Sequence, residues 1–250
     1  MRLSLGSLLY DLVFNERCHV CNKNSYWKFA PFCFSCWHKI EPFSLNYIFT
    51  GQFKGDFWKY IVSLHSFGAY EGVLKSAIHC FKYGGIKRIG RELGKLMSKI
   101  NPPDIDILIP VPLHIKKLRL REFNQSAILA KELSKAWNTP LSINSLIKIK
   151  DTLDQASLEA KDRFHNIKDA YSVIKGVKGL KVGLVDDVVT TGSTIMECAK
   201  VLKKAGAKEI HLRLSSPEIK FPCYYGIDTV SYTHLRAHET VLDLVCRLLL

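Results

Sequence analysis

The sequence has no apolar run of about 18 residues, the length that a helix needs to cross a membrane. Its first residues, Met1 to Phe14, contain a single basic side chain and no small-residue cleavage site, so they do not predict a secretory signal. No internal repeat is evident beyond two cysteine pairs. These absences argue against a membrane span, a secreted protein and a repeat array, and they favour a cytoplasmic location.

Acidic residues are scarce beside basic ones. The chain has 23 Asp plus Glu against 36 Lys plus Arg, a formal net charge of +13. This excess favours phosphate-rich ligands such as nucleotides, pyrophosphate or nucleic acid, although a merely soluble basic surface has the same charge. With 250 residues, 47% of them hydrophobic, the chain is long enough for one α/β domain and a small module.

The eight cysteines do not form a disulfide framework, because four lie in two Cys-x-x-Cys pairs and four are scattered. The pairs Cys18/Cys21 and Cys33/Cys36 can place four thiolates around one Zn²⁺ at about 2.3 Å each. An iron site or redox-active pairs are the alternatives. Four thiolates leave no open position for catalysis, so we predict a structural zinc ribbon whose folding depends on the metal.

The most informative stretch runs from Lys181 to Thr194. Its apolar, β-branched run Val182 to Val185 predicts a central parallel strand. Asp186 and Asp187 then stand in a predicted turn at the carboxyl end of that strand, where open α/β sheets bind their ligands. Two adjacent carboxylates can accept hydrogen bonds from vicinal ribose hydroxyls or hold Mg²⁺ through water.

Small hydroxyl residues separate this acidic pair from a helical pattern over Ile195 to Lys204. Their loop therefore lies at a helix N-terminus, where N–H groups and the helix dipole favour a phosphate. The glycine permits close approach or a positive φ angle. A plain acidic turn with a Thr/Ser helix cap is the alternative. The candidate phosphate ligands are Thr190, Thr191, Gly192, Ser193 and Thr194.

A second buried strand, Asp106 to Pro112, precedes a predicted loop with two arginines and two lysines. Arg119 and Arg121 are the first candidates for a pyrophosphate, because a guanidinium binds oxyanions in a bidentate manner. Lys82, near the end of a helical pattern over Gly72 to Tyr83, is a further candidate for a phosphate. A solvated basic surface is the alternative in both places.

The remaining patterns complete a mostly parallel sheet flanked by helices, with right-handed connections. The ligand site should lie across the carboxyl ends of the strands at 182–185 and 107–109. The other predicted elements are strands over Ser66–Glu71, Ile143–Ile149 and Glu209–Leu214, and helices over Ile86–Ile100 and Ser126–Trp137.

The stretch from Lys181 to Thr194 resembles the PRPP-binding motif of type I phosphoribosyltransferases (PRPP is 5-phosphoribosyl-1-pyrophosphate). The resemblance implies that Asp186 and Asp187 bind the ribose hydroxyls and that residues 190–194 surround the 5′-phosphate. Purine-salvage members carry an aspartate at the position of Thr190, so the resemblance does not extend to a hypoxanthine- or guanine-type activity.

Further motifs follow one another along residues 15 to 210. They are the paired cysteines, Phe81-Lys82-Tyr83-Gly84, Pro110-Val111-Pro112-Leu113, Arg121-Glu122-Phe123-Asn124-Gln125, and then Gln155, Arg163 and Asn166. In this order they are similar to the ComF family, although Glu122 stands where that family usually has glycine. The resemblance implies a zinc ribbon joined to a type I phosphoribosyltransferase fold and a link to DNA uptake in competent bacteria.

Two functions are compatible with these features. The first is transfer of a 5-phosphoribosyl group from PRPP, with Mg²⁺ and the basic residues stabilising the departing pyrophosphate. The motif contains no obvious general base, so the acceptor is open. The second is a non-catalytic accessory that handles nucleic acid. Its zinc ribbon and basic surface would engage single-stranded DNA or a translocation partner such as a DNA-uptake helicase.

The expected domains are a zinc ribbon with a helical lead (1–45), a linker (46–64), the phosphoribosyltransferase-like domain (65–230) and a tail (231–250). Residues 205–229 are similar to the same region of amidophosphoribosyltransferase. Neither an iron–sulfur cluster nor a glutaminase activity is expected, because the companion cysteines and an amino-terminal cysteine nucleophile are missing. The tail looks like translated adapter sequence, with a native amphipathic helix as the alternative.

Overall fold

The computed structural model describes residues 17–25, 31–40, 45–48, 58–68, 70–100, 102–152, 166–189 and 192–217. The predicted helical lead, the tail, and Gln155, Arg163, Thr190 and Thr191 lie outside these residues. Contacts divide the chain into two compact units, and the second, Lys220–Leu250, also lies outside them. Within the described part, no helix combines the length and apolar character needed to cross a membrane.

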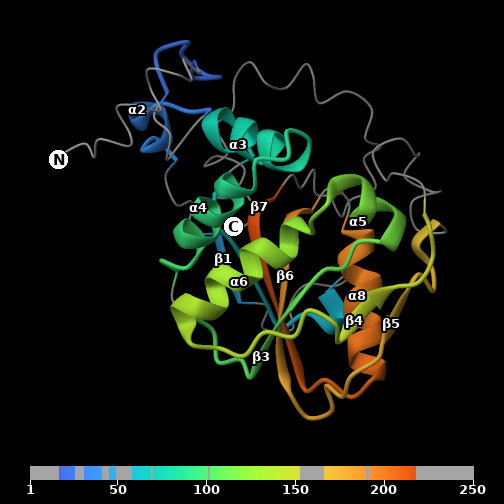
Figure 1. Ribbon diagram of the computed structural model, residues 1–250. Coiled ribbons are helices and arrows are strands. Elements are labelled where there is room, and N and C mark those ends of the chain that lie inside the picture. The colour runs from blue at the N-terminus through green and yellow to red at the C-terminus, as the bar shows by residue number, and fades with distance from the viewer. Residues whose placement is uncertain are drawn as a thin grey trace, which may run out of the picture. The chain divides into compact units, whose positions relative to one another are not determined.

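A five-stranded sheet organises the chain, in the order β1-β2-β7-β6-β3. β2, β7, β6 and β3 are parallel to their neighbours, and only the edge strand β1 runs antiparallel, so the predicted mostly parallel sheet is confirmed (Figure 1). The strands are β1 (Leu45–Ile48), β2 (Ser63–Ser66), β3 (Ile107–Pro110), β6 (Lys181–Val189) and β7 (Glu209–Pro217).

Helices connect the parallel strands and cover the sheet. α6 lies in front of the sheet in Figure 1 and contacts β6 and β3, whereas α8 stands beside the small pair β4 and β5. The described helices are α2 (Phe34–Trp37), η1 (Trp58–Tyr60), α3 (Gly72–Lys82), α4 (Lys87–Met97), α5 (Ile115–Arg121), α6 (Gln125–Trp137) and α8 (Ser193–Lys204). The predicted α/β architecture is therefore present.

Alternating side chains divide the apolar core between the two faces of the sheet. Leu108 and Val185 are buried in one cluster with residues of α3, α4 and α6. Their neighbours Ile109 and Leu184 are buried in a second cluster with residues of α8. Successive residues of a strand point to opposite faces, so both faces of a central strand need apolar side chains. The carboxyl ends of β6 and β3 consequently stand at one edge of a rigid, doubly covered sheet.

Two local predictions at this edge are wrong. β6 does not end at Val185 but continues through both aspartates to Val189, because β7 runs beside it and pairs Asp186 with Leu214 in register. The basic segment that holds Arg119 and Arg121 is not a loop but the helix α5. Its N-cap is His114, whose side chain accepts a hydrogen bond from the backbone N–H of Lys116.

The segment predicted as a linker, 46–64, also differs from expectation. It contributes most of β1, all of η1 and the start of β2, so this part of the chain extends the sheet. The strand predicted over Ser66–Glu71 corresponds to β2, which ends at Ser66. The strand predicted over Ile143–Ile149 is β4 (Leu146–Lys148), which pairs with β5 (Tyr171–Val173) in a separate antiparallel pair. The apolar, β-branched composition of β4 and β5 did not distinguish them from strands of the central sheet.

Glu122 ends α5 with a left-handed backbone, φ 61°. A left-handed conformation costs an ordinary residue about 1–2 kcal/mol and costs glycine almost nothing, which explains why glycine suits this position. The carboxylate of Glu122 lies 3.8 Å from the Lys87 ammonium, but both side chains are well exposed, so this ion pair adds little stability.

We expect Glu122→Gly to raise the free energy of unfolding by about 0.5–1 kcal/mol, since relief of strain exceeds the extra entropy of the unfolded chain. Urea denaturation measures the change. Glu122→Ala is the control, because it removes the same ion pair and keeps the strain. A glycine variant no more stable than the alanine variant would contradict the argument.

Candidate functional site

Asp186 lies buried near the carboxyl end of β6. Its Oδ1 accepts hydrogen bonds from the Ser126 hydroxyl (2.8 Å) and from the backbone N–H of Asp187 (2.9 Å). Burial and the neighbouring charge of Asp187 raise the pKa of Asp186 to about 7, against the opposing effects of Lys82 and the hydrogen bonds. This carboxyl group therefore exchanges a proton near neutral pH.

Only one of the two carboxylate oxygens of Asp187 has partners among the described residues. Its Oδ1 accepts a hydrogen bond from the backbone N–H of Val188 (2.7 Å) and lies 3.2 Å from the Lys82 ammonium. Ser215 on β7 donates its hydroxyl to the backbone carbonyl of Asp187. The other carboxylate oxygen, Oδ2, is buried and has no hydrogen-bond partner among the described residues. A buried carboxylate oxygen without a donor is costly, so this atom marks a place for a ligand.

Lys82 is the last residue of α3, and only 21% of its side chain is exposed. Burial alone would lower the pKa of Lys82, but Asp187 and Asp186 together raise it above the ordinary value. The lysine is thus charged. One ammonium faces two carboxyl groups, and a cation or a proton must balance the remaining negative charge when both are ionised.

Two sequence motifs meet beside this lysine. The rings of Phe81 and Phe123 stack with their centroids 5.6 Å apart. The guanidinium of Arg121 lies 5.6 Å from the centre of the Tyr83 ring, an arrangement typical of a cation–π contact. Arg121 is therefore held near the end of α3, whereas Arg119 is exposed on α5. Of the three predicted pyrophosphate ligands, Lys82 contacts Asp187 and Arg121 contacts Tyr83, the next residue after Lys82.

The segment predicted to bind a phosphate, residues 190–194, is described from Gly192 onward. Gly192 precedes α8 and has a left-handed backbone, φ 73°. This glycine provides no side chain to cap the helix. Ser193 and Thr194 form the first turn of α8, soon after β6 ends. Burial raises the pKa of the Tyr171 phenol, which lies near the hydroxyl of Thr194. Thr194 can offer a phosphate its backbone N–H.

Sequence reasoning missed two residues that support the acidic pair. Ser126 donates a hydrogen bond to Asp186, and Ser215 donates one to the backbone carbonyl of Asp187. Ser126 follows the Asn-Gln motif directly, so that motif was a usable signal. Nothing local distinguished Ser215, because its role depends on β7 lying beside β6.

The residues present fit a hard cation. Mg²⁺ prefers oxygen ligands and often keeps several of its waters. The unpartnered Oδ2 of Asp187 and the surplus negative charge of the pair provide that chemistry. Asp186 and Asp187 are the residues that would hold Mg²⁺, directly or through water.

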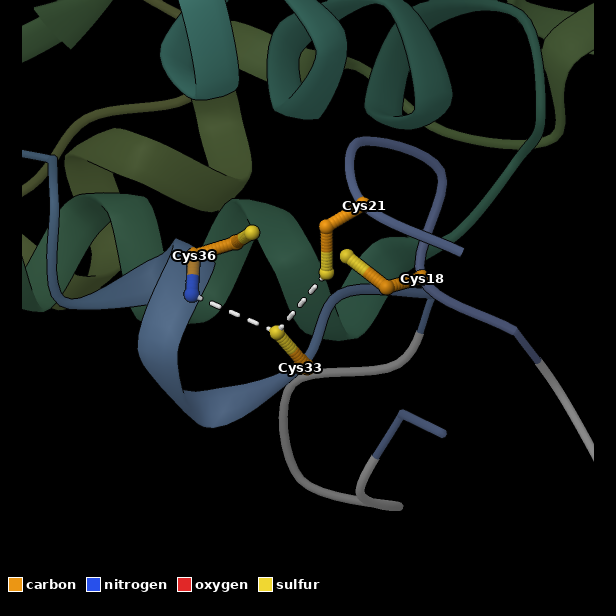
Figure 2. Close-up of side chains that lie close together, drawn as sticks. All are labelled: Cys18, Cys21, Cys33 and Cys36. Atoms are coloured by element: carbon orange, nitrogen blue, oxygen red, sulfur yellow. Dashed lines mark hydrogen bonds between the residues drawn. The ribbon is translucent and has the colours of Figure 1, made fainter. Parts of the chain in front are cut away.

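The four paired cysteines form a second candidate centre. Figure 2 shows the side chains of Cys18, Cys21, Cys33 and Cys36 converging, and their sulfurs all lie within 4.8 Å of one another. The sulfurs of Cys21 and Cys33 lie 3.6 Å apart. Tetrahedral coordination with Zn–S bonds of about 2.3 Å needs sulfurs about 3.8 Å apart, so a small contraction completes the site.

The donor set also requires a cation. Burial and the neighbouring cysteines raise the pKa of the Cys36 thiol to about 12. Burial also acts to raise the pKa of Cys18, but hydrogen bonds lower it to about 6. Without a metal the Cys36 thiol therefore stays protonated near neutral pH, whereas Zn²⁺ binds thiolates. His19 and His38 are not members of the described ligand group.

Elemental analysis tests this centre, and we expect one zinc per chain. Cys36→Ser should abolish zinc binding and lower the melting temperature, because the ribbon has little core of its own. Cys198→Ala is the matched control: Cys198 is buried in the other core cluster, so this variant should keep its zinc. Full zinc occupancy in Cys36→Ser would contradict the four-cysteine assignment.

The raised pKa of Asp186 gives a pH-dependent stability. Between about pH 4 and pH 7 the folded chain holds a proton that the unfolded chain has released, so stability falls as pH rises. Asp186→Asn keeps an acceptor oxygen and has no charge to bury. Its stability relative to wild type should therefore rise with pH through this window, by at most about 1.4 kcal/mol per pH unit.

Urea titrations at several pH values measure this difference. Asp104→Asn is the control, because Asp104 is exposed and its hydrogen bond from Lys181 lowers its pKa. The difference between Asp104→Asn and wild type should stay flat from pH 5 to pH 8. A flat difference for Asp186→Asn as well would show that Asp186 ionises with an ordinary pKa.

The chain is similar to several known proteins. The family model of the phosphoribosyl transferase domain matches residues 124–215. Competence protein F of Haemophilus influenzae is 32% identical over 212 residues, which cover 79% of this chain and 89% of that protein. DNA utilization protein YhgH of Salmonella typhi is 29% identical over 163 residues, 62% of this chain and 70% of YhgH.

Amidophosphoribosyltransferase of Methanocaldococcus jannaschii is 30% identical over 154 residues, 61% of this chain. The chain spans only 30% of the length of that enzyme. The similarity to competence protein F, in contrast, extends along most of both chains. The protein belongs to the competence protein F (ComF) family and carries a phosphoribosyl transferase domain.

Proposed function

We propose that the chain binds PRPP together with Mg²⁺ at the carboxyl end of β6. The observation that carries this proposal is the buried, unpartnered Oδ2 of Asp187 beside a second carboxyl group and a single ammonium. A ribose hydroxyl donates the hydrogen bond that this oxygen lacks, and a magnesium ion supplies the missing positive charge. The matched phosphoribosyl transferase domain includes both aspartates.

Three groups of residues at this edge of the sheet bind different parts of PRPP. Asp186 and Asp187 take the ribose hydroxyls. The start of α8, with Gly192 and the N–H groups that follow it, takes the 5′-phosphate, because a helix N-terminus favours an anion. Lys82, which lies 3.2 Å from Asp187, and Arg121, which contacts the neighbouring Tyr83, take the pyrophosphate.

This site supports transfer of the 5-phosphoribosyl group to a nitrogenous acceptor. The new bond joins the acceptor nitrogen to C1 of the ribose, while the bond from C1 to the pyrophosphate oxygen breaks and its electron pair leaves with pyrophosphate. Bound Mg²⁺ would neutralise charge on the pyrophosphate. The cations of Lys82 and Arg121 stabilise the same developing charge.

A role in handling DNA is a second candidate. YhgH, a relative, is named a DNA utilization protein, and this chain has a formal net charge of +13. On α5, Lys116 and Arg119 are exposed together with Leu120, whose side chain is 85% exposed. Such a basic and apolar helix surface is suited to single-stranded DNA or to a protein partner.

Isothermal titration calorimetry with PRPP and Mg²⁺ tests the first proposal. We expect Asp187→Asn to weaken binding roughly tenfold to a hundredfold, since a hydrogen bond to a charged group is worth about 1.5–3 kcal/mol. Asp104→Asn, a matched change near the start of β6, should bind as wild type does. Asp186→Asn provides a second test if loss of the ion pair with Lys82 unfolds Asp187→Asn.

Equal affinity in wild type and both site variants would remove the acidic pair from PRPP binding. The affinity for single-stranded DNA, measured over a range of salt concentrations, tests the proposed role in handling DNA. Contacts to DNA phosphates give a steep loss of affinity as the salt concentration rises. A salt-sensitive DNA affinity that Asp187→Asn leaves unchanged would place DNA on a different surface from PRPP.

A further inference from the structure

Arg213 on β7 is a buried cation without a counter-ion. Its side chain is only 2% exposed. One guanidinium nitrogen, Nη1, donates a hydrogen bond to the backbone carbonyl of Leu212 (2.8 Å). The other two, Nε and Nη2, are buried without a hydrogen-bond partner. No carboxylate of the described residues forms an ion pair with this arginine.

The two unpartnered nitrogens lie on the same edge of the guanidinium. Their N–H groups point outward in parallel, which is the arrangement that receives the two oxygens of a carboxylate or phosphate. Burial lowers the pKa of Arg213 to about 9, so the group remains protonated at neutral pH. A buried, charged and half-satisfied guanidinium is costly, and an oxyanion on the free edge removes that cost.

A second unsatisfied group belongs to the neighbouring strand. His65 on β2 is opposite Arg213 in the parallel register, so the two side chains leave the sheet on the same face. The Nδ1 of His65 is buried and also lacks a hydrogen-bond partner. Burial and the charge of Arg213 lower the pKa of His65 to about 4. A neutral imidazole with its hydrogen on Nδ1 can donate that hydrogen to the same anion.

The neighbouring register pair on β2 and β7 is also polar. Ser63 and His211 are opposite each other in register and hydrogen-bonded, with Ser63 Oγ 2.8 Å from His211 Nδ1. The other ring nitrogen of His211 lies 3.2 Å from a carboxylate oxygen of Glu209. The Glu209 carboxylate therefore pairs with His211. Among these four residues of β2 and β7, only Arg213 and His65 have buried polar atoms without a hydrogen-bond partner.

We propose that Arg213 and His65 form a binding site for a small oxyanion, a carboxylate or a phosphate, on this face of β7 and β2. The site differs from the acidic pair in sign and in position. Val185 is the register partner of Arg213 on β6, two residues before Asp187. The proposal does not depend on PRPP binding.

The pKa of His65 in the full-length protein, followed by NMR of ¹⁵N-labelled histidines, tests the site. His65→Gln assigns the signal. Inorganic phosphate and acetate are added separately at matched ionic strength. A bound anion should raise the pKa of His65 by about one unit or more, as an opposite charge within a few ångströms does. The arm that gives the larger shift distinguishes phosphate from carboxylate, and a phosphate bound only at α8 would leave His65 unchanged.

Arg213→Met is the matched variant, since it keeps an unbranched side chain of similar length and removes the charge. It should lose the anion-induced shift and be at least as stable as wild type in anion-free buffer. Arg213→Lys is the substitute if the methionine variant does not fold, and it should weaken the response because it lacks the bidentate edge. The absence of any shift in wild type would overturn the proposal. A strong destabilisation by Arg213→Met, without an anion effect in wild type, would instead assign Arg213 a partner within the chain.

Discussion

The structure depends on the burial of two adjacent carboxyl groups at the end of a central strand. Burial disfavours their charged forms, so every nearby element contributes compensation: α6 a hydroxyl to Asp186, β7 a hydroxyl to the backbone of Asp187, and α3 the ammonium of Lys82. These contributions remain one positive charge short. Burial and the charge of Asp187 raise the pKa of Asp186 to about 7, and one oxygen of Asp187 has no donor among the described residues. Both features favour a cationic, hydroxyl-bearing ligand.

α3 connects this site with the cysteine cluster. Cys80 Sγ lies 3.4 Å from His19 Nδ1, next to the first zinc ligand in sequence, and two residues later Lys82 reaches Asp187. The buried residues of the ribbon and of α3 also belong to one apolar cluster. A metal that orders the ribbon therefore orders a surface against which α3 packs, and α3 holds the lysine. The small module contributes to the site without providing a ligand to it.

Sequence patterns predicted what depends on residues close together in the chain. The parallel sheet, most of the helices, the four cysteines and the acidic pair followed from local periodicity and spacing. What failed depended on neighbours in space: β6 continues past Val185 because β7 provides a partner, and Arg121 belongs to a helix because His114 caps it. The pairing of Lys82 with Asp187 had no local signal either. Glu122 is instructive, since its departure from glycine was visible in the sequence while its left-handed backbone was not.

The two buried cations on this side of the sheet show why charge alone does not locate a site. Lys82 and Arg213 are both largely removed from solvent, yet their surroundings shift their pKa values in opposite directions. Two carboxyl groups face Lys82 and raise its pKa, whereas burial alone acts on Arg213 and lowers its pKa. A cation with its counter-ion in place can help to bind a ligand by sharing that counter-ion. A cation without one needs the ligand itself to be the counter-ion, and the unoccupied edge of the guanidinium defines the geometry that this ligand must have.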